Sequence, residues 1–434
     1  MPNWRIVLAS QNKFMIIKID HIAKIEGHAG FVAEIANGQV EKVRLDILEG
    51  ARLLEGILRS RSVNEVSQIS ARICGVCPVV HNLTSLKALE EALGVKVSPQ
   101  TVLLRKLLML GQIMNSHALH LFFFSLSDFF GFKNDLSLIK KLPQKAQAGM
   151  AIREFGNKII EVIGGRSIHP LTPKIGGFTK LPDLKKLAEL QKQSPEILKK
   201  ALELARLFSG LKYPDFKHAS PFVSLGAEDE YPFYDGPIKT SKEQKFKISE
   251  FLSVVKEHQL ARSAVKRSEF GGKTFMVGAL SRLNNNASHL NPEAKKLLNF
   301  SKLKLPNFNP FFNIFAQAVE IVHCAEEAQK LLKLAAERGL AEEKNDWSPR
   351  SGEGCGAIEA PRGTLYYYYK ISGDGRIEDC NIITPTSQNL ARLESDLKEY
   401  LTEFVGRSAP QKEIEEKIKM LVRAYDPCLT CATH

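Results

Sequence analysis

Four of the seven cysteines form two CxxC pairs whose spacing suits metal binding. Cys74 and Cys77 lie in "RICGVCPVVH", whereas Cys428 and Cys431 lie in the C-terminal "DPCLTCATH". A CxxC turn places two thiolates on one side of a tight loop, close enough to bind one metal ion. Two such turns from opposite ends of the chain predict a site with four thiolate ligands.

Spacing alone leaves three kinds of site open. A structural zinc site is the commonest use of paired CxxC turns, although its pairs usually lie closer together in sequence. An iron–sulfur cluster is also compatible, because thiolates suit both metals. A thioredoxin-like redox pair would need a βαβ setting, which the sequence lacks.

Composition narrows the protein class and the compartment. The N-terminus shows no apolar run followed by a small-residue cleavage site, and an odd number of cysteines argues against a disulfide framework. We therefore expect a reduced, cytoplasmic protein. The formal net charge is +12, but the lysines are scattered along amphipathic stretches such as 181–208, so no nucleic-acid partner is expected.

The elements that must position these cysteines differ along the chain. A β-hairpin is expected over 30–48 around Asn37-Gly38, and a second β segment over 364–385 around Gly373-Asp374-Gly375. Helix periodicity dominates from about 145 to 345, and this region includes a long helix over 311–340. Further helices are expected over 63–72, from Ser98-Pro99 to about 130, and near 387–404 and 410–424. The apolar run 120–132 is expected to be buried in the core.

This order predicts an α+β fold that is mainly α, with a central bundle of long helices. The N- and C-terminal β segments would converge on a buried metal site. We expect a single intertwined domain over 1–434.

The residues around the cysteines resemble the two signature motifs of the nickel–iron hydrogenase large subunit. The resemblance extends to "KIEGH" (24–28), "IGGRSIHP", "EAPRGTL" (359–365) and "ITPTSQN" (383–389), and so covers most of the chain. It implies a Ni–Fe centre whose iron carries two cyanides and one carbon monoxide, and heterolytic cleavage of H2 to protons and electrons.

Carried over by motif, all four cysteines are nickel ligands. Cys74 and Cys428 would be terminal, and Cys77 and Cys431 would bridge to iron. The resemblance makes Cys428 the first proton acceptor and Glu26 the relay that carries the proton outward. A partly buried carboxyl whose pKa is raised suits that role.

Other matched residues would surround the centre. Arg362, after Pro361, would lie over the open metal face, and Asp426 would hold it by charge-assisted hydrogen bonds. Pro361 would line the cofactor, Thr386 would donate to a cyanide, and His81 would bond a bridging sulfur.

One position departs from the respiratory members of the family. They place an aspartate opposite the arginine, whereas this chain has Ser116 in "NSHALH", which favours the cytoplasmic, cofactor-linked branches. Many members of the NAD(P)-linked sulfhydrogenase branch, however, replace the histidine that is His81 here. The subgroup therefore stays open.

The resemblance also implies a Mg²⁺ site formed by Glu55, the backbone carbonyl of Ile382 and the side chain of His434. Arg166 and His169 would face a partner's iron–sulfur cluster. The remaining cysteines, Cys324, Cys355 and Cys380, are expected to be buried structural thiols.

No cysteine set remains for an iron–sulfur cluster in this chain, so electrons would leave through an iron–sulfur small subunit. Further NAD(P)- or ferredoxin-linked subunits, nickel-insertion factors and a C-terminal maturation protease are also implied. Ending at His434 is expected to be the matured form. Two alternatives are a non-catalytic core subunit like those of complex I, whose relatives have lost these cysteines, and a zinc-stabilised structural protein.

Overall fold

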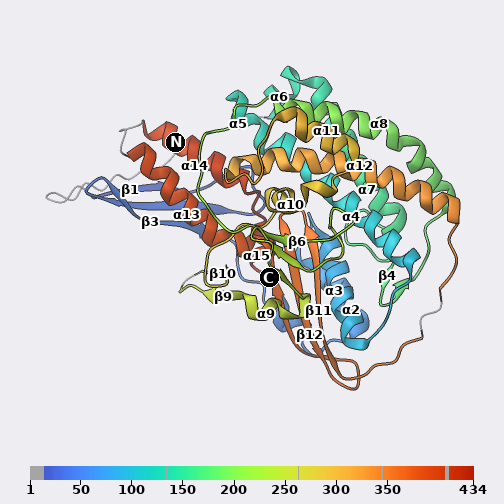
Figure 1. Cartoon of the computed structure of the whole chain (residues 1–434). Coiled ribbons are helices and arrows are strands. Elements are labelled where there is room, and N and C mark those ends of the chain that lie inside the picture. Colours follow the sequence, from blue (N-terminus) through green and yellow to red (C-terminus); the bar gives the residue numbers. More distant parts are fainter. Residues whose placement is uncertain (1–13, 133–134, 262, 344–345, 406–409) are drawn as a thin grey trace.

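Long helices packed side by side form the largest part of the molecule in this computed structural model (Figure 1). The structure describes residues 14–132, 135–261, 263–343, 346–405 and 410–434. The principal bundle helices are α4 (Pro99–Leu119), α7 (Pro143–Gly164), α8 (Leu184–Ser209) and α12 (Asn313–Arg338). The predicted bundle and its long helix over 311–340 are confirmed.

Helix α4 begins as its sequence predicts. The Ser98 hydroxyl accepts the backbone N–H of Thr101, and Pro99 occupies the first turn. The helix continues through a π-helical turn (His120–Ser125) into α5 (Leu126–Phe130). Within the described chain, this is the one helix long and apolar enough to cross a membrane, but 78% of its apolar window is buried by the protein. It is therefore a core helix, as predicted.

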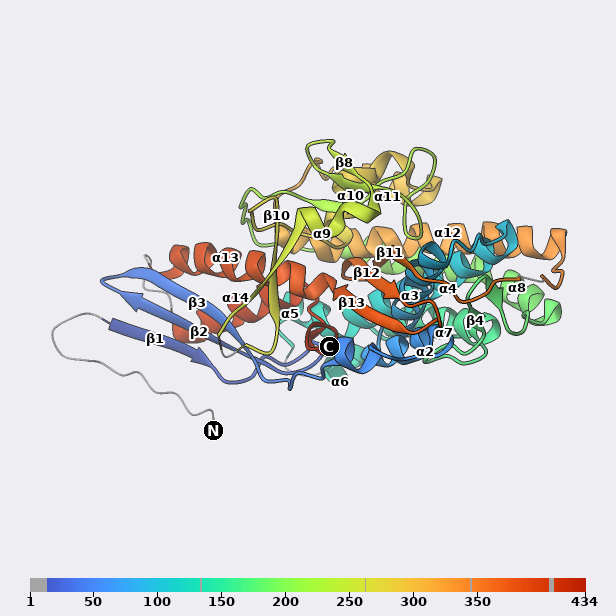
Figure 2. The same cartoon turned by 90° about the horizontal axis from the view of Figure 1, so that it is seen from below.

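The N-terminal sheet projects from the body of the molecule beside the C-terminal helices (Figures 1 and 2). Its antiparallel strands are β1 (Phe14–Ile19), β2 (Ala29–Ala36) and β3 (Gln39–Ile47). The predicted hairpin is confirmed, with Asn37 and Gly38 both at positive φ, as a tight turn with a matching twist requires. Strand β1 was not predicted.

The C-terminal sheet packs against the helix that follows the first cysteine pair. It contains β11 (Gly352–Ala360), β12 (Gly363–Ile371) and β13 (Ile377–Ile383), and it lies on α3 (Pro78–Leu93). The pair β12–β13 was predicted, whereas β11 was missed. Side chains at Gly352, Gly354 and Gly356 would collide with the α3 backbone, so these glycines permit close helix–sheet packing.

The prediction that helices dominate 145–345 is wrong for much of 211–278. This stretch carries small antiparallel strands, some of which lie on the face of the molecule uppermost in Figure 2. Their alternation is short and interrupted, so the sequence pattern did not show them. They are β6 (Val223–Leu225), β7 (Ile238–Thr240), β8 (Lys245–Phe246), β9 (Val255–Gln259) and β10 (Lys266–Phe270).

Shorter elements complete the described chain. The expected helix over 63–72 is α2 (Val63–Ser70) followed by a 3₁₀ turn, and the last two predicted helices are α13 (Pro385–Val405) and α14 (Gln411–Ala424). The others are α1 (Leu54–Leu58), α6 (Asp135–Lys141), β4 (Pro173–Lys174), β5 (Gly177–Phe178), α9 (Phe251–Val254), α10 (Ala279–Asn286), α11 (Pro292–Ser301) and α15 (Leu429–Ala432).

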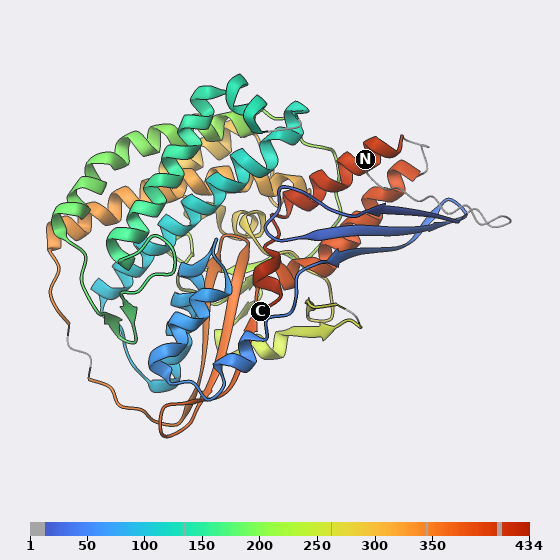
Figure 3. The same cartoon turned by 180° about the vertical axis from the view of Figure 1, so that it is seen from behind.

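The C-terminal residues lie at the centre of the molecule, where the sheets and the bundle meet (Figures 1 and 3). Leu429 donates its N–H to the carbonyl of Glu26, so the two ends of the described chain are joined by hydrogen bonds. The second cysteine pair is thereby brought into the core.

Candidate metal centre

The four CxxC cysteines come together in one buried cluster. Their sulfurs all lie within 4.8 Å of one another. The Cys74–Cys428 distance is 3.5 Å, Cys77–Cys431 is 3.2 Å and Cys428–Cys431 is 3.0 Å. Sulfurs that bind one metal ion at about 2.3 Å lie roughly 3.3 to 3.8 Å apart, so a metal fits with small adjustments.

Local backbone structure aims these sulfurs at a common point. Cys77 precedes the first turn of α3 and so lies at the positive end of that helix, and Cys428 directly precedes the short helix α15. The N–H of Val76 lies 3.2 Å from the Cys74 sulfur. Arg52 donates to the carbonyls of Ile73 and Thr430 and so ties the two cysteine loops together.

Four buried thiolates would need a compensating positive charge. Hydrogen bonds from the other thiols, first that of Cys428, lower the pKa of Cys74 well below its usual value. Burial raises the pKa of Cys428 and of Cys431 well above theirs, because a thiolate without water is unfavourable, and repulsion by a neighbouring thiolate raises both further. A divalent soft metal would supply the missing charge and hold all four as thiolates.

Glu26 contacts Cys428 directly. The sulfur lies 3.1 Å from Glu26 Oε2, while Thr430 donates its N–H (3.1 Å) and its hydroxyl (2.7 Å) to the same carboxylate. Glu26 is partly exposed, so it connects the buried sulfur with the outside. A side chain at Gly27 would lie 2.8 Å from the Leu429 side chain, which explains the glycine in "KIEGH".

Arg362 lies in a buried polar pocket beside the sulfurs. Its guanidinium donates to Asp426 Oδ1 at 3.0 Å, to the Asp426 carbonyl at 3.2 Å and to the Ser116 hydroxyl at 2.7 Å. Burial alone would lower the pKa of Arg362, but Asp426 and the thiolates raise it above its usual value, so it stays charged. Ser116 thus faces the arginine, as its position in "NSHALH" predicts.

His81, Thr386 and Pro361 also lie at this site, with partners that differ in part from those expected. His81 Nδ1 is 2.8 Å from the Tyr367 hydroxyl, and burial lowers the pKa of His81 to about 3, so the imidazole is neutral. The Thr386 hydroxyl accepts the N–H of Cys428 at 3.0 Å, which leaves its own proton for another acceptor. Pro361 forms the turn that presents Arg362.

The three predicted Mg²⁺ ligands are neighbours. His434 Nε2 lies 2.8 Å from the Ile382 carbonyl and 3.9 Å from Glu55 Oε1. His434 Nδ1 lies 2.7 Å from the Cys431 carbonyl. A neutral imidazole has one N–H, so it can donate to only one of these two carbonyls. A cation between the other ring nitrogen and its carbonyl, or a second ring proton, would account for the other short distance.

The remaining sequence candidates are less central. His169 Nδ1 is 2.9 Å from the carbonyl of Ala71, beside the loop of the first cysteine pair, whereas Arg166 is exposed. Cys324 and Cys380 are buried as expected, but Cys355 is only half-buried because it lies in β11 toward an open side of the sheet. The prediction was therefore wrong for Cys355.

Sequence inspection missed several residues that support the site. Gln317 donates to Asp426 Oδ2 at 3.0 Å, and its side-chain oxygen lies 2.5 Å from His120 Nδ1. Arg52 and Thr430 were missed as well. His120 lies in "NSHALH" and Thr430 in "DPCLTCATH", but Arg52 and Gln317 have no local motif around them.

A buried cluster of four cysteine sulfurs has the donor set of a metal site, and a carboxylate and an arginine lie next to it. Comparison with known proteins identifies the family to which the chain belongs. The model of the family described as nickel-dependent hydrogenase matches residues 52–151 and 227–434. The chain therefore belongs to the nickel-dependent hydrogenase family, and it is the metal-bearing catalytic subunit of a nickel–iron hydrogenase.

Relatives and solved structures agree. The chain is 34% identical to the alpha subunit of sulfhydrogenase 1 of Pyrococcus furiosus over 98% of this chain and 99% of that one. It is 30% identical to the matching chain of the F420-non-reducing hydrogenase of Methanothermobacter marburgensis, covering 96% and 94% of the two chains. An NAD⁺-reducing [NiFe]-hydrogenase structure in the H2-reduced state matches with a TM-score of 0.88 and 27% identity, covering 96% and 99%.

Proposed function

We propose that Cys74, Cys77, Cys428 and Cys431 hold a Ni–Fe(CN)2(CO) centre, with Cys77 and Cys431 as the bridging ligands. Bound there, such a centre supplies the heterolytic cleavage of H2 that characterises the family. The observation that carries this proposal is the single buried cluster of four sulfurs. Thr386 retains a hydroxyl proton and would donate it to a cyanide, and Pro361 would line the cofactor.

Side chains of this protein would accept the proton released from H2 and carry it toward solvent. The Cys428 sulfur accepts it, and the Glu26 carboxylate, 3.1 Å away, takes it toward solvent. The two donors from Thr430 hold the Glu26 carboxylate in place. Arg362, fixed by Asp426 and Ser116, presents a permanent positive charge beside the sulfurs and stabilises negative charge that develops there.

Metal analysis of the native complex tests this assignment. We expect about one nickel per chain, together with infrared bands of cyanide and carbon monoxide, because the thiolate set is soft and buried. Stoichiometric zinc without those bands would instead support a structural zinc protein. A chain with neither metal but full assembly would support the non-catalytic alternative.

We also propose a Mg²⁺ site at Glu55, the Ile382 carbonyl and His434. Cis ligands of an octahedral Mg²⁺ at about 2.1 Å lie about 3 Å apart. The 2.8 Å between His434 Nε2 and the Ile382 carbonyl is close to that value. The site opens on a cavity of about 450 Å³. Lys266 also lines this cavity, and its ammonium lies 3.5 Å from the Glu55 carboxylate.

Glu55→Gln is expected to abolish the rise in melting temperature that Mg²⁺ gives the complex, because an amide replaces the charged ligand. Thermal unfolding with Mg²⁺ and with a chelator measures this response. Glu257→Gln is the matched control, since Glu257 lines the same cavity and also pairs with Lys266, at 3.0 Å, but is not one of the proposed Mg²⁺ ligands. An undiminished Mg²⁺ response in Glu55→Gln would contradict the assignment.

We propose that the electron partner is an iron–sulfur small subunit, with NAD(P)- or ferredoxin-linked subunits beyond it. The loop around His169 supports a docking face, because Ile168 and Leu171 are about half exposed next to the segment that leads into Cys74. We propose that dedicated nickel-insertion and maturation factors load the centre, because all four sulfurs are buried in the folded chain. We also propose that the complex is cytoplasmic. Purification of the native complex and identification of its subunits tests these partners.

A further inference from the structure

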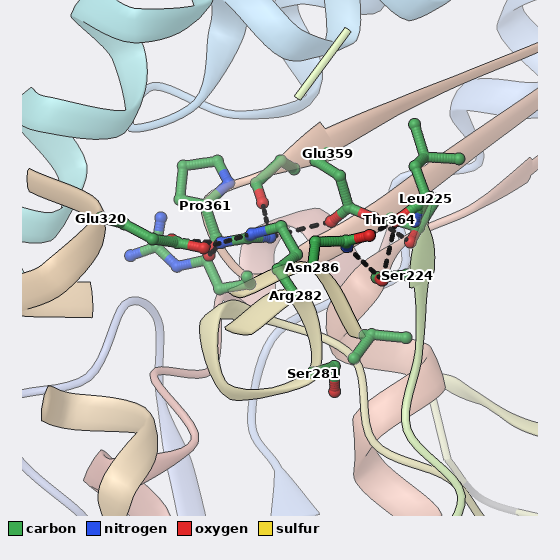
Figure 4. A network of polar contacts seen from close by, with 12 residues as sticks. Ser224, Leu225, Ser281, Arg282, Asn286, Glu320, Glu359, Pro361 and Thr364 are labelled. Atoms are coloured by element: carbon green, nitrogen blue, oxygen red, sulfur yellow. Dashed lines mark hydrogen bonds and ion pairs between the residues drawn. The ribbon is translucent and has the colours of Figure 1, made fainter. Parts of the chain in front are cut away.

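Arg282 lies at the centre of a fully buried polar cluster outside the thiolate site (Figure 4). Its Nε and Nη2 donate to the two oxygens of Glu320 at 2.7 Å each. Its Nη1 donates to Glu359 Oε2 at 2.8 Å and to the Ala360 carbonyl at 2.9 Å, and Nη2 also donates to the Pro361 carbonyl at 3.1 Å. One guanidinium therefore joins two carboxylates and two successive backbone carbonyls.

Both carboxylates are fixed by further donors. Glu320 also contacts the Tyr231 hydroxyl at 2.8 Å and His117 Nε2 at 2.8 Å. Glu359 accepts the N–H of Leu225 at 2.6 Å and the hydroxyl of Thr364 at 2.7 Å. Figure 4 shows Arg282 between these two acidic side chains and next to Pro361. Because α10, α12, β6, β11 and β12 all contribute, the guanidinium cannot shift without moving several elements.

The carbonyls that Arg282 holds belong to the turn that carries Arg362. Ala360 pairs with Gly363 across the β11–β12 hairpin, so Pro361 and Arg362 form its two-residue tip. A side chain at Gly363 would collide with the Val277 side chain, so the tip packs tightly against the segment that enters α10. Helix α10 and the segment before it thus both contact the tip.

We propose that Arg282 is a positioning residue for H2 turnover, which acts by fixing the Pro361–Arg362 turn and hence the place of the Arg362 guanidinium beside the thiolates. This inference rests on the proposed role of Arg362. Arg282 itself makes no contact with a cluster sulfur among the hydrogen bonds and ion pairs of the described residues.

Arg282→Lys in the complete hydrogenase complex tests the proposal. Lysine keeps the charge but cannot bind two carboxylates and two carbonyls at once. We expect kcat to fall about 100-fold, the loss typical of a displaced active-site group, with KM and nickel content unchanged. The infrared bands of the diatomic ligands should shift, because the charge of Arg362 moves. Full kcat with unshifted bands overturns the proposal.

Arg105→Lys is the matched control. Arg105 is equally buried and donates to both oxygens of Glu90 at 2.8 and 2.6 Å, but it does not contact the β11–β12 tip. Its variant should keep kcat within about twofold and leave the infrared bands in place. If both variants lose activity and nickel equally, the effect is general destabilisation and the positioning role is wrong.

A double-mutant cycle separates this inference from the role of Arg362. If Arg282 acts through Arg362, then Arg282→Lys should cause no further loss of kcat in an Arg362→Lys background. Equal losses in both backgrounds contradict the inference. Full activity of Arg362→Lys alone would instead remove the proposed role of Arg362.

A charge-balanced pair covers the case in which Arg282→Lys does not assemble. Arg282→Gln with Glu320→Gln removes one charge of each sign, so the net charge of the buried cluster is unchanged. This double variant should assemble with normal nickel content and still show the loss in kcat and the shifted bands. Normal kcat in the assembled double variant would refute the positioning role.

Discussion

Replacing Cys431 by serine is expected to lower the nickel content of the purified complex at least tenfold and H2 turnover in proportion. Even groups that only contact metal ligands change affinity by about 10- to 100-fold, so the loss of a ligand should cost at least as much. A serine hydroxyl is a poor ligand for a soft metal, because it stays protonated and its oxygen is hard. Metal analysis and H2 uptake on the same preparation measure both effects.

Cys431 is the informative position because it does not contact Glu26. Its sulfur lies beside those of Cys77 and Cys428, at 3.2 and 3.0 Å, so its loss affects metal binding and leaves the Cys428–Glu26 contact in place. Cys355→Ser is the control, since Cys355 is half-buried in β11 and outside the cluster. Normal nickel and turnover in Cys431→Ser would show that Cys431 is not a ligand.

The cysteine cluster could be predicted from sequence because each CxxC turn is a local feature. The spacing alone left zinc, an iron–sulfur cluster and a redox pair open, and only the flanking motifs separated them. Glu26, Arg362 and Asp426 were found by resemblance, since a lone charged residue carries no pattern that distinguishes it from a surface group.

Arg282, Glu320 and Glu359 illustrate what sequence could not provide. They lie on α10, α12 and β11, far apart in sequence, and only the tertiary fold brings them together. Arg282 and Glu320 lie in the region of ordinary helix periodicity, and Glu359 lies in a strand that the sequence did not predict. Buried polar networks of this kind are specified by partners from several elements, and no local periodicity records them.

The same reasoning applies to the strands. The β2–β3 hairpin was predicted because Asn37-Gly38 is a turn that its own two residues define. Strand β11 was missed because its glycines read as breakers, although they allow α3 to pack against the strand. Packing against a partner helix is a tertiary requirement, so the glycines could be interpreted only after the structure was known.

Glu26→Gln should lower H2 turnover by about 100- to 10,000-fold, the usual contribution of a positioned acid or base, while nickel content and thermal stability stay unchanged. Glutamine matches glutamate in shape and can still accept from Thr430, but it cannot take the proton that Cys428 presents at 3.1 Å. The infrared bands should therefore still respond to H2, since the thiolate cluster is intact while proton exit is blocked.

Glu49→Gln is the control for a nearby charge. Its carboxylate accepts from the backbone and ring of His28 at 2.8 Å each and makes no hydrogen bond to Cys428 among the described residues, so turnover should stay within about twofold. Glu26→Asp adds a graded test, because the shorter side chain keeps the acid but lengthens the path from sulfur to carboxylate. If Glu26 relays the proton, turnover should rank as wild type, then aspartate, then glutamine. Equal turnover in all three would place the proton path elsewhere.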